Sequence, residues 1–192
     1  MATVRKGNKG ALLIVDVQVG VMREAWDAPR IIRNVAAAVD KARVAQVPVV
    51  WVQHSDEQLV LGSPEWEWVP ELAPLEGEKR IYKNFNSSFE RTELEEALES
   101  EGISHIALAG AATNWCIRAT AYGALERGYD LTLVKDAHTT GSIDLENGEK
   151  IEAPSFINDL NIAMTWLDYP ERKNTAAGLA EIDFEGLRGS DG

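Results

Sequence analysis

Hydrophobic residues along this chain fall into two kinds of segment. Short apolar runs with few polar interruptions are typical of strands buried on both faces, and we expect strands at Ala11–Val17, Val49–Gln53, Lys79–Tyr82, His105–Ala109, Tyr129–Val134 and Thr175–Glu181. Apolar residues at helical spacing predict helices at Asp27–Gln46, Thr92–Ser100, Trp115–Arg127 and Pro154–Leu167. Strand and helix alternate, which predicts an α/β fold with a parallel sheet covered by helices on both faces.

Length and composition narrow the class of protein. A chain of 192 residues predicts one domain, which we expect over residues 1–185, with a disordered tail at residues 186–192. The net charge of −12 argues against binding to nucleic acid or to an anionic membrane. The first apolar run is too short to cross a membrane, and a single cysteine cannot form a disulfide within the chain. We therefore expect a cytoplasmic protein.

The segment between the second and third expected strands interrupts the alternation of strand and helix. It runs from His54 to Glu78 and holds three prolines and two tryptophans, Trp66 and Trp68. Loops longer than about a dozen residues without regular structure are uncommon and often functional. Two interpretations stay open: a lid or wall of a binding pocket, or a packed surface loop that contacts another subunit.

The only cysteine, Cys116, lies where strand, turn and helix signals meet. The small residues Gly110 to Ala112 follow the strand His105–Ala109, and Thr113 or Asn114 can cap the next helix. Cys116 is therefore expected in the first turn of that helix. Backbone N–H groups and the helix dipole would stabilise a thiolate there and could hold an oxyanion. The alternative is that Cys116 is a small buried hydrophobic residue.

Two charged residues follow other expected strands. Asp16 lies near the end of the first apolar run, and Lys83 follows the run Lys79–Tyr82 directly. Read singly, Asp16 could cap a loop and Lys83 could be an ordinary exposed lysine. Because the carboxyl ends of parallel strands share one edge, neighbouring strands would bring both residues to Cys116. The acid could then take the thiol proton, the lysine could stabilise both charges, and the thiolate could attack a carbonyl.

These residues resemble the Asp–Lys–Cys triad of the isochorismatase-like cysteine hydrolases. The likeness is carried by LLIVDVQ around Asp16, KNFNSSFERTEL from Lys83, and AGAATNWCIRATAYGALERGYDLTLVKDA around Cys116. The resemblance implies a three-layer α/β/α sandwich with a six-stranded parallel sheet. It also implies a cis peptide between Ala111 and Ala112, and an oxyanion hole made by the backbone N–H groups of Ala112 and Cys116.

The amidase-like branch of that family, which includes relatives of streptothricin hydrolase, is similar in other stretches. These are HSDE, GSPEWE, PELAP, YPER and EIDF. Nicotinamidases, another branch, carry a D-x-H metal motif and a second histidine downstream. The matching segment here, VQHSDEQLVLGSPEWEW, has one histidine, so we expect no metal and no cofactor. The substrate pocket is expected to include five residues: Gln18, Trp26, His54, Phe85 and Trp115.

The sequence therefore predicts a cysteine hydrolase that cleaves an amide-type C–N bond of a small molecule through a thioester on Cys116. We expect it to work as a homo-oligomer of two or more subunits. Two alternatives stay open. One is an isochorismatase that cleaves a vinyl ether, and the other is a catalytically silent oligomeric interaction protein.

Overall fold

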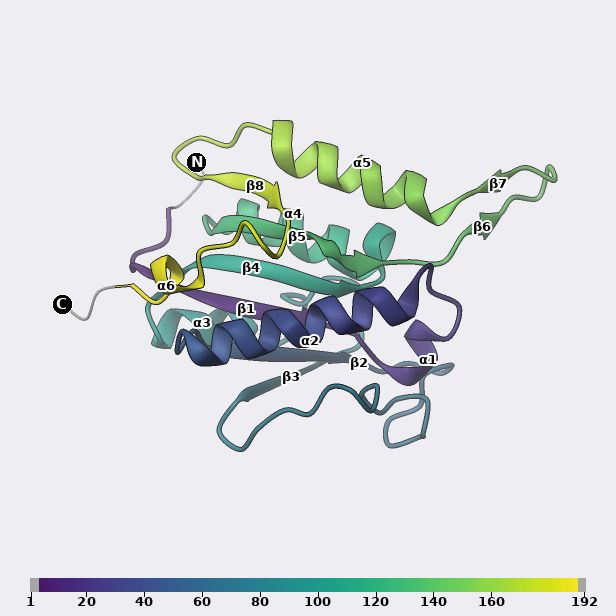
Figure 1. Cartoon of the computed structure of the whole chain (residues 1–192), viewed down its shortest axis with the longest axis horizontal. Coiled ribbons are helices and arrows are strands. Elements are labelled where there is room, and N and C mark those ends of the chain that lie inside the picture. Colours follow the sequence, from purple (N-terminus) through teal and green to yellow (C-terminus); the bar gives the residue numbers. More distant parts are fainter. Residues whose placement is uncertain (1–3, 190–192) are drawn as a thin grey trace.

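A central parallel sheet organises the chain, of which the computed structural model describes residues 4–189. Its strands are β1 (Lys9–Val15), β2 (Val49–His54), β3 (Lys79–Lys83), β4 (Ile103–Ala111), β5 (Asp130–Thr139) and β8 (Asn174–Ala177). They lie in the order β3-β2-β1-β4-β5-β8, with every neighbouring pair parallel (Figure 1). The expected six-stranded parallel sheet is thus confirmed.

Helices cover both faces of this sheet. One face packs against α2 (Ala28–Val44) and the short α6 (Phe184–Leu187). The opposite face packs against α3 (Leu94–Ser100), α4 (Arg118–Glu126) and α5 (Ala153–Trp166). The remaining elements are the single turn α1 (Val19–Met22), the π-helical turn η1 (Thr113–Ile117) and a hairpin of β6 (Ile143–Asp144) and β7 (Lys150–Ile151) that extends away from the sheet (Figure 1). The three-layer α/β/α sandwich is confirmed.

The central strand β1 shows why its sequence is an unbroken apolar run. Leu12 and Ile14 belong to the core under α2, whereas Leu13 and Val15 belong to the core under α3, α4 and α5. Successive side chains of a strand point to opposite faces, and here both faces are covered. Every residue from Ala11 to Val15 is fully buried, so none of these positions has a face open to water.

Close backbone approach at the end of β1 and β4 shapes the edge where candidate functional residues gather. Asp16 follows β1 with a left-handed φ of 52°, a region that aspartate tolerates better than most residues, and its N–H donates to the carbonyl of Val52 at 2.9 Å. Gly110 of β4 has a φ of +127°, and a Cβ there would lie 2.0 Å from the carbonyl oxygen of Val15. Glycine is required at this position.

The structure differs from the expected elements in several places. β5 runs to Thr139 instead of ending at Val134, because a register shift lets its polar end pair again with β4, His138 opposite Gly110. The short elements α1, α6 and the β6–β7 hairpin carry too little periodicity to be predicted. Phe184 and Leu187 of α6 are buried, so helix extends past the boundary expected at residue 186. Residues 190–192 of the expected tail lie outside the described part of the chain.

None of the helices within residues 4–189 combines the length and the apolar character needed to span a membrane.

Gly110→Ala should lower the free energy of unfolding by about 3 kcal/mol or more, because the new methyl group meets the Val15 carbonyl in a glycine-only conformation. Gly148→Ala is the matched control. Gly148 also has a positive φ, +84°, but its Cβ would meet nothing within 4 Å, so the loss should be about 1 kcal/mol. Urea unfolding of both variants measures the difference, and equal losses would contradict the steric argument.

Candidate active site

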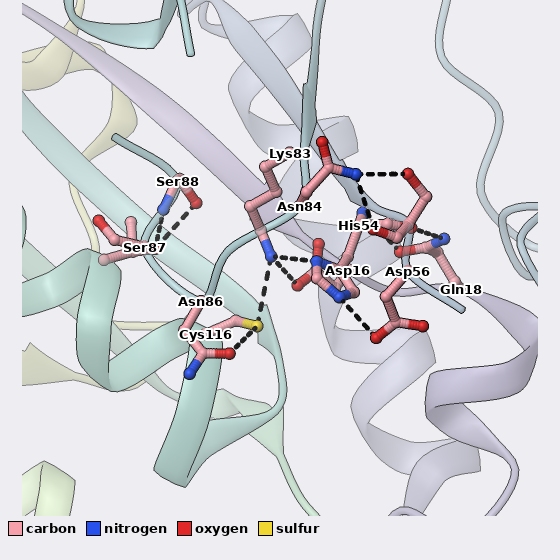
Figure 2. Close-up of polar contacts among 12 residues, drawn as sticks. Asp16, Gln18, His54, Asp56, Lys83, Asn84, Asn86, Ser87, Ser88 and Cys116 are labelled. Atoms are coloured by element: carbon pink, nitrogen blue, oxygen red, sulfur yellow. Dashed lines mark hydrogen bonds and ion pairs between the residues drawn. The ribbon is translucent and has the colours of Figure 1, made fainter. Parts of the chain in front are cut away.

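Three strand ends bring Asp16, Lys83 and Cys116 together. Asp16 follows β1, Lys83 is the last residue of β3, and Cys116 lies in η1 after β4. The Lys83 ammonium donates to Asp16 Oδ2 at 2.7 Å and to Cys116 Sγ at 3.3 Å (Figure 2). Lys83 reaches across the intervening strand β2 to make both contacts. The sequence-based expectation that these three residues meet at one sheet edge therefore matches the observed arrangement.

This polar group is almost closed to water. Lys83 is 2% exposed, Asp16 is 1% exposed and Cys116 is 9% exposed. The second carboxylate oxygen, Asp16 Oδ1, is buried and has no hydrogen-bond partner among the described residues. A buried polar atom without a partner is costly, and in native proteins such an atom calls for an explanation.

Burial also sets the charge of the thiol. It raises the pKa of Cys116 to about 12, and the negative charge of Asp16 adds to this rise, while the Lys83 ammonium opposes it in part. Burial raises the pKa of Asp16 as well, against the opposing effect of Lys83. The expectation of a resting thiolate is therefore wrong. Desolvation and a neighbouring carboxylate outweigh the ammonium, and the resting nucleophile is a neutral thiol.

The apolar spacing predicted Cys116 in the first turn of an ordinary α-helix, and this prediction is wrong. Cys116 belongs to η1, in which the N–H groups of Trp115 and Ile117 both donate to the carbonyl of Ala112, each at 3.1 Å. The peptide bond between Ala111 and Ala112, just before this turn, is cis. The Cys116 N–H lies between those two donors in sequence.

The two candidate caps serve other partners. The Thr113 hydroxyl and the ring Nδ1 of His138 are 2.8 Å apart, and the Asn114 side-chain oxygen accepts from the Thr140 hydroxyl at 2.5 Å. Neither residue caps a helix with its side chain. Both contacts tie the turn that carries Cys116 to the end of β5.

Two adjoining cavities lie at this edge of the sheet and are bordered by neighbours of the three residues. The larger has a volume of 540 Å³ and is bordered by the backbone turn at Ala112 and by Trp115, which is 55% exposed. The smaller, of 300 Å³, is bordered by His54 and Asp56. They share four lining residues: Gly20, Val21, Arg23 and Gln58. Together the two cavities are large enough to receive a small molecule next to the turn that carries Cys116.

The five expected pocket residues divide into two groups. His54 and Trp115 each border one of the two cavities. Among the described residues that line these cavities, Gln18, Trp26 and Phe85 do not occur. Gln18 is fully buried and its amide is used within the fold, as it accepts from the His54 N–H and donates to two carbonyls. Trp26 and Phe85 are about half exposed and each lies against an arginine.

The long segment after β2 forms a packed wall of the smaller cavity. Trp68 packs edge-on against Trp51 of β2, with ring centroids 5.1 Å apart, and Trp66 stacks on Tyr82 of β3 at 6.0 Å. The carbonyl of Trp66 accepts hydrogen bonds from the amides of Gln18 and Gln53, both at 2.7 Å. The segment is therefore a packed loop that also borders a cavity, and both interpretations stay open.

Two residues that contact Cys116 or His54 had no signal in the sequence. Asn86 Oδ1 lies 4.0 Å from Cys116 Sγ, and Asp56 Oδ2 lies 3.0 Å from His54 Nε2 (Figure 2). Both lie on loops after strands, where no periodicity marks a residue. Within residues 4–189, no group of three or more His, Cys, Asp or Glu side chains is arranged to hold a metal ion. The residues around His54 thus do not fit the metal site of nicotinamidases.

Comparison with known proteins agrees with this architecture. Residues 10–151 match the model of the isochorismatase domain. The chain belongs to the isochorismatase family. An isochorismatase from Pseudomonas putida KT2440 has the same fold, with a TM-score of 0.81 at 24% sequence identity over 95% of this chain and 94% of that one.

Similar curated proteins include two hydrolases that are named for their substrates. The chain is 32% identical to a streptothricin hydrolase of Streptomyces noursei over 155 residues, which cover 77% of this chain and 61% of the relative. It is 28% identical to the maleamate amidohydrolase of Pseudomonas putida over 155 residues, 68% of this chain and 72% of the relative. The matched region thus spans less than two thirds of the streptothricin hydrolase.

Substitutions of the two charged neighbours should change the reactivity of Cys116 in opposite directions. Asp16→Asn removes the negative charge that raises the thiol pKa, so alkylation by iodoacetamide at pH 8 should become about tenfold faster or more. Lys83→Met removes the charge that lowers this pKa, so alkylation should become slower by a similar factor.

Mass spectrometry of the alkylated protein gives both rates, and circular dichroism checks that each variant is folded. The wild-type protein should react slowly at pH 7, because its thiol is neutral there. Slower alkylation of Asp16→Asn would contradict this electrostatic account and would indicate that Asp16 removes the thiol proton during alkylation.

Proposed function

We propose that this protein is a cysteine hydrolase that cleaves an amide-type C–N bond of a small molecule without a cofactor. The observation that carries the proposal is the buried, hydrogen-bonded group of Asp16, Lys83 and Cys116. The turn that carries Cys116 also borders a cavity of 540 Å³, through Ala112 and Trp115. Family membership and the names of two relatives, a streptothricin hydrolase and a maleamate amidohydrolase, support the reaction class. The residues support the roles that follow.

Proton transfer from Cys116 to Asp16 starts the reaction. Because the resting thiol is neutral, its proton must leave as sulfur attacks the carbonyl carbon. Asp16 Oδ1 is the acceptor, since Oδ2 is already engaged with Lys83 and Oδ1 has no partner among the described residues. The raised pKa of Asp16 makes its carboxylate a better base than an ordinary aspartate.

The backbone around the turn stabilises the oxyanion that forms on the carbonyl oxygen. The proposed donors are the N–H groups of Ala112, just before the turn η1, and of Cys116, within it. Donors fixed in advance need no reorganisation during the reaction, which is the source of their effect. The contacts of Thr113 and Asn114 with the end of β5 hold this turn in place.

Collapse of the tetrahedral intermediate breaks the C–N bond. Asp16 returns its proton to the leaving nitrogen, which departs as an amine or ammonia, and the acyl group stays on sulfur as a thioester. A water molecule then gives a proton to Asp16 as its oxygen attacks the thioester carbonyl. The acid product leaves, the thiolate takes that proton back from Asp16, and the site returns to its starting state.

Lys83 stabilises both negative charges during this cycle. Its ammonium contacts Asp16 Oδ2 and Cys116 Sγ at once, so it opposes the build-up of charge on either atom. It also fixes the distance between base and nucleophile. An ammonium between two groups that exchange a proton is a preorganised electrostatic element.

Two further expectations, a homo-oligomeric assembly and a cytoplasmic location, stay predictions. The exposed apolar side chains of Ile162 and Trp166 on α5 offer a surface for another subunit. Isochorismate hydrolysis and a silent interaction protein remain the alternatives. The experiment below distinguishes all three.

Small amides, carbamoyl compounds and isochorismate should be screened against the wild-type protein and Cys116→Ala. We expect turnover of an amide or carbamoyl compound, and a loss of at least about a thousandfold in kcat for Cys116→Ala. Mass spectrometry of protein quenched during turnover should find an acyl group on Cys116. Ser100→Ala, at the exposed end of α3, serves as a control and should keep full activity.

The same screen can overturn the proposal. Hydrolysis of isochorismate by Cys116→Ala at the wild-type rate would favour the vinyl ether reaction. The absence of turnover with every compound, together with a Cys116 that iodoacetamide does not label at any pH, would favour the silent protein.

Treatment with EDTA should leave the amidase activity unchanged. The reason is the lack, within residues 4–189, of a group of three or more metal-binding side chains, since a metal site normally has at least three protein ligands. Activity before and after chelation, and after adding back zinc or iron, measures this. Loss on chelation and recovery with metal would contradict the proposed mechanism.

A further inference from the structure

We propose that His54 is a positioning residue for Lys83, and that its neutral ring nitrogen Nδ1 fixes the ammonium between Asp16 and Cys116. The inference rests on the proposed function for its catalytic meaning. Its structural content rests on the contacts of His54 with three residues: Lys83, Asp56 and Gln18.

The first step concerns the donors of Lys83. An ammonium has three N–H groups and no acceptor. Lys83 Nζ has three neighbours in range: Asp16 Oδ2 at 2.7 Å, Cys116 Sγ at 3.3 Å and His54 Nδ1 at 3.4 Å (Figure 2). With its side chain fully buried, Lys83 depends on these acceptors, because a buried charge without partners is costly. His54 therefore satisfies the third donor.

The second step concerns the proton on the imidazole. For Nδ1 to accept from an ammonium it must carry no proton, so the ring hydrogen belongs on Nε2. Nε2 lies 3.0 Å from Asp56 Oδ2, which can accept it. The other carboxylate oxygen of Asp56 accepts from the N–H groups of Gln58 and Leu59 at 2.8 and 2.7 Å. These bonds lower the pKa of Asp56, so the acceptor stays ionised.

The third step concerns the rigidity of His54 itself. His54 ends β2 and pairs in register with Lys83 of β3. Its N–H donates to Gln18 Oε1 at 2.9 Å, and its carbonyl accepts from Gln18 Nε2 at 3.0 Å. Both backbone groups are thus held by one fully buried side chain. A ring on such a fixed backbone can set the direction of an ammonium, whereas a ring on a loose loop could not.

A chain of contacts therefore runs from the protein surface to the nucleophile: Asp56, His54, Lys83 and then Cys116 and Asp16. If His54 were lost, the third N–H of Lys83 would have no acceptor, and the ammonium could turn away from sulfur. Small misplacements of catalytic groups cost large factors in rate. The effect should fall on kcat more than on KM, because Lys83 acts on the reacting atoms.

The position of the acceptor distinguishes a positioning role from simple filling of space. His54→Asn places an amide oxygen close to the position of Nδ1, whereas His54→Gln places it close to that of Nε2. We expect kcat to fall about 10- to 100-fold in His54→Ala and His54→Gln, and His54→Asn to regain most of the loss. His105→Asn is the matched control, since His105 contacts Thr132 at 2.8 Å on another part of the sheet, and it should keep wild-type kcat and KM.

A second measurement is independent of any substrate. Nitrogen-15 NMR of the wild-type protein should show His54 with a protonated Nε2 and an unprotonated Nδ1. The chain has three histidines, so single His→Asn variants assign each signal. Lys83→Met should move the Nδ1 signal of His54 and leave that of His105 in place.

Different results would overturn the proposed function and the positioning role of His54. Wild-type protein that hydrolyses no compound in the screen, and whose Cys116 iodoacetamide does not label, would overturn the proposed function, and the NMR experiment would still test the contact between His54 and Lys83. Equal kcat for His54→Asn and His54→Gln, wild-type kcat in His54→Ala, or a His54 signal that Lys83→Met does not move would each overturn the positioning role.

Discussion

The buried ion pair between Lys83 and Asp16 is the constraint on which the rest of the site depends. Two opposite charges at 2.7 Å, both almost closed to water, are stable only as a pair, and losing one partner from such a pair typically costs about 3–5 kcal/mol. The pair links β3 to β1 across β2, so the three strands must end at matching heights. The strand register of the fold is therefore also the register that places these two charges side by side.

Much of the fold could be predicted because both faces of the sheet are covered. The strand cores around Leu12 and Ile106 are unbroken apolar runs, and the stripe of α2 from Ile31 to Ala42 is equally plain. The end of β5 escaped prediction because its pairing at His138 comes from backbone contact with β4, not from apolar side chains. The turn η1 escaped it because an i−5 hydrogen bond has no signature in a helical stripe.

The residues of the candidate site could be predicted from the sequence, but the shift in the pKa of Cys116 could not. The order of strands brought Asp16, Lys83 and Cys116 together, as parallel topology requires. The pKa of Cys116 depends on how completely water is excluded and on how near the carboxylate lies, and a linear sequence contains neither quantity. The contact between His54 and Asp56 was hidden for a similar reason, since it depends on the local turn at Gln58 and Leu59.

The wall of the smaller cavity is tied to the catalytic scaffold through the main chain. Both Gln18 and Gln53 donate to the carbonyl of Trp66, and a backbone carbonyl is present whatever side chain the residue carries. The side chains of Gln58 and Glu65 border the cavity without taking part in that attachment. Substitution of either side chain would therefore leave the attachment of the wall intact. Descendants of this chain could exchange these cavity side chains one by one and inherit the scaffold unchanged, which is a structural basis for one fold to offer many different cavities.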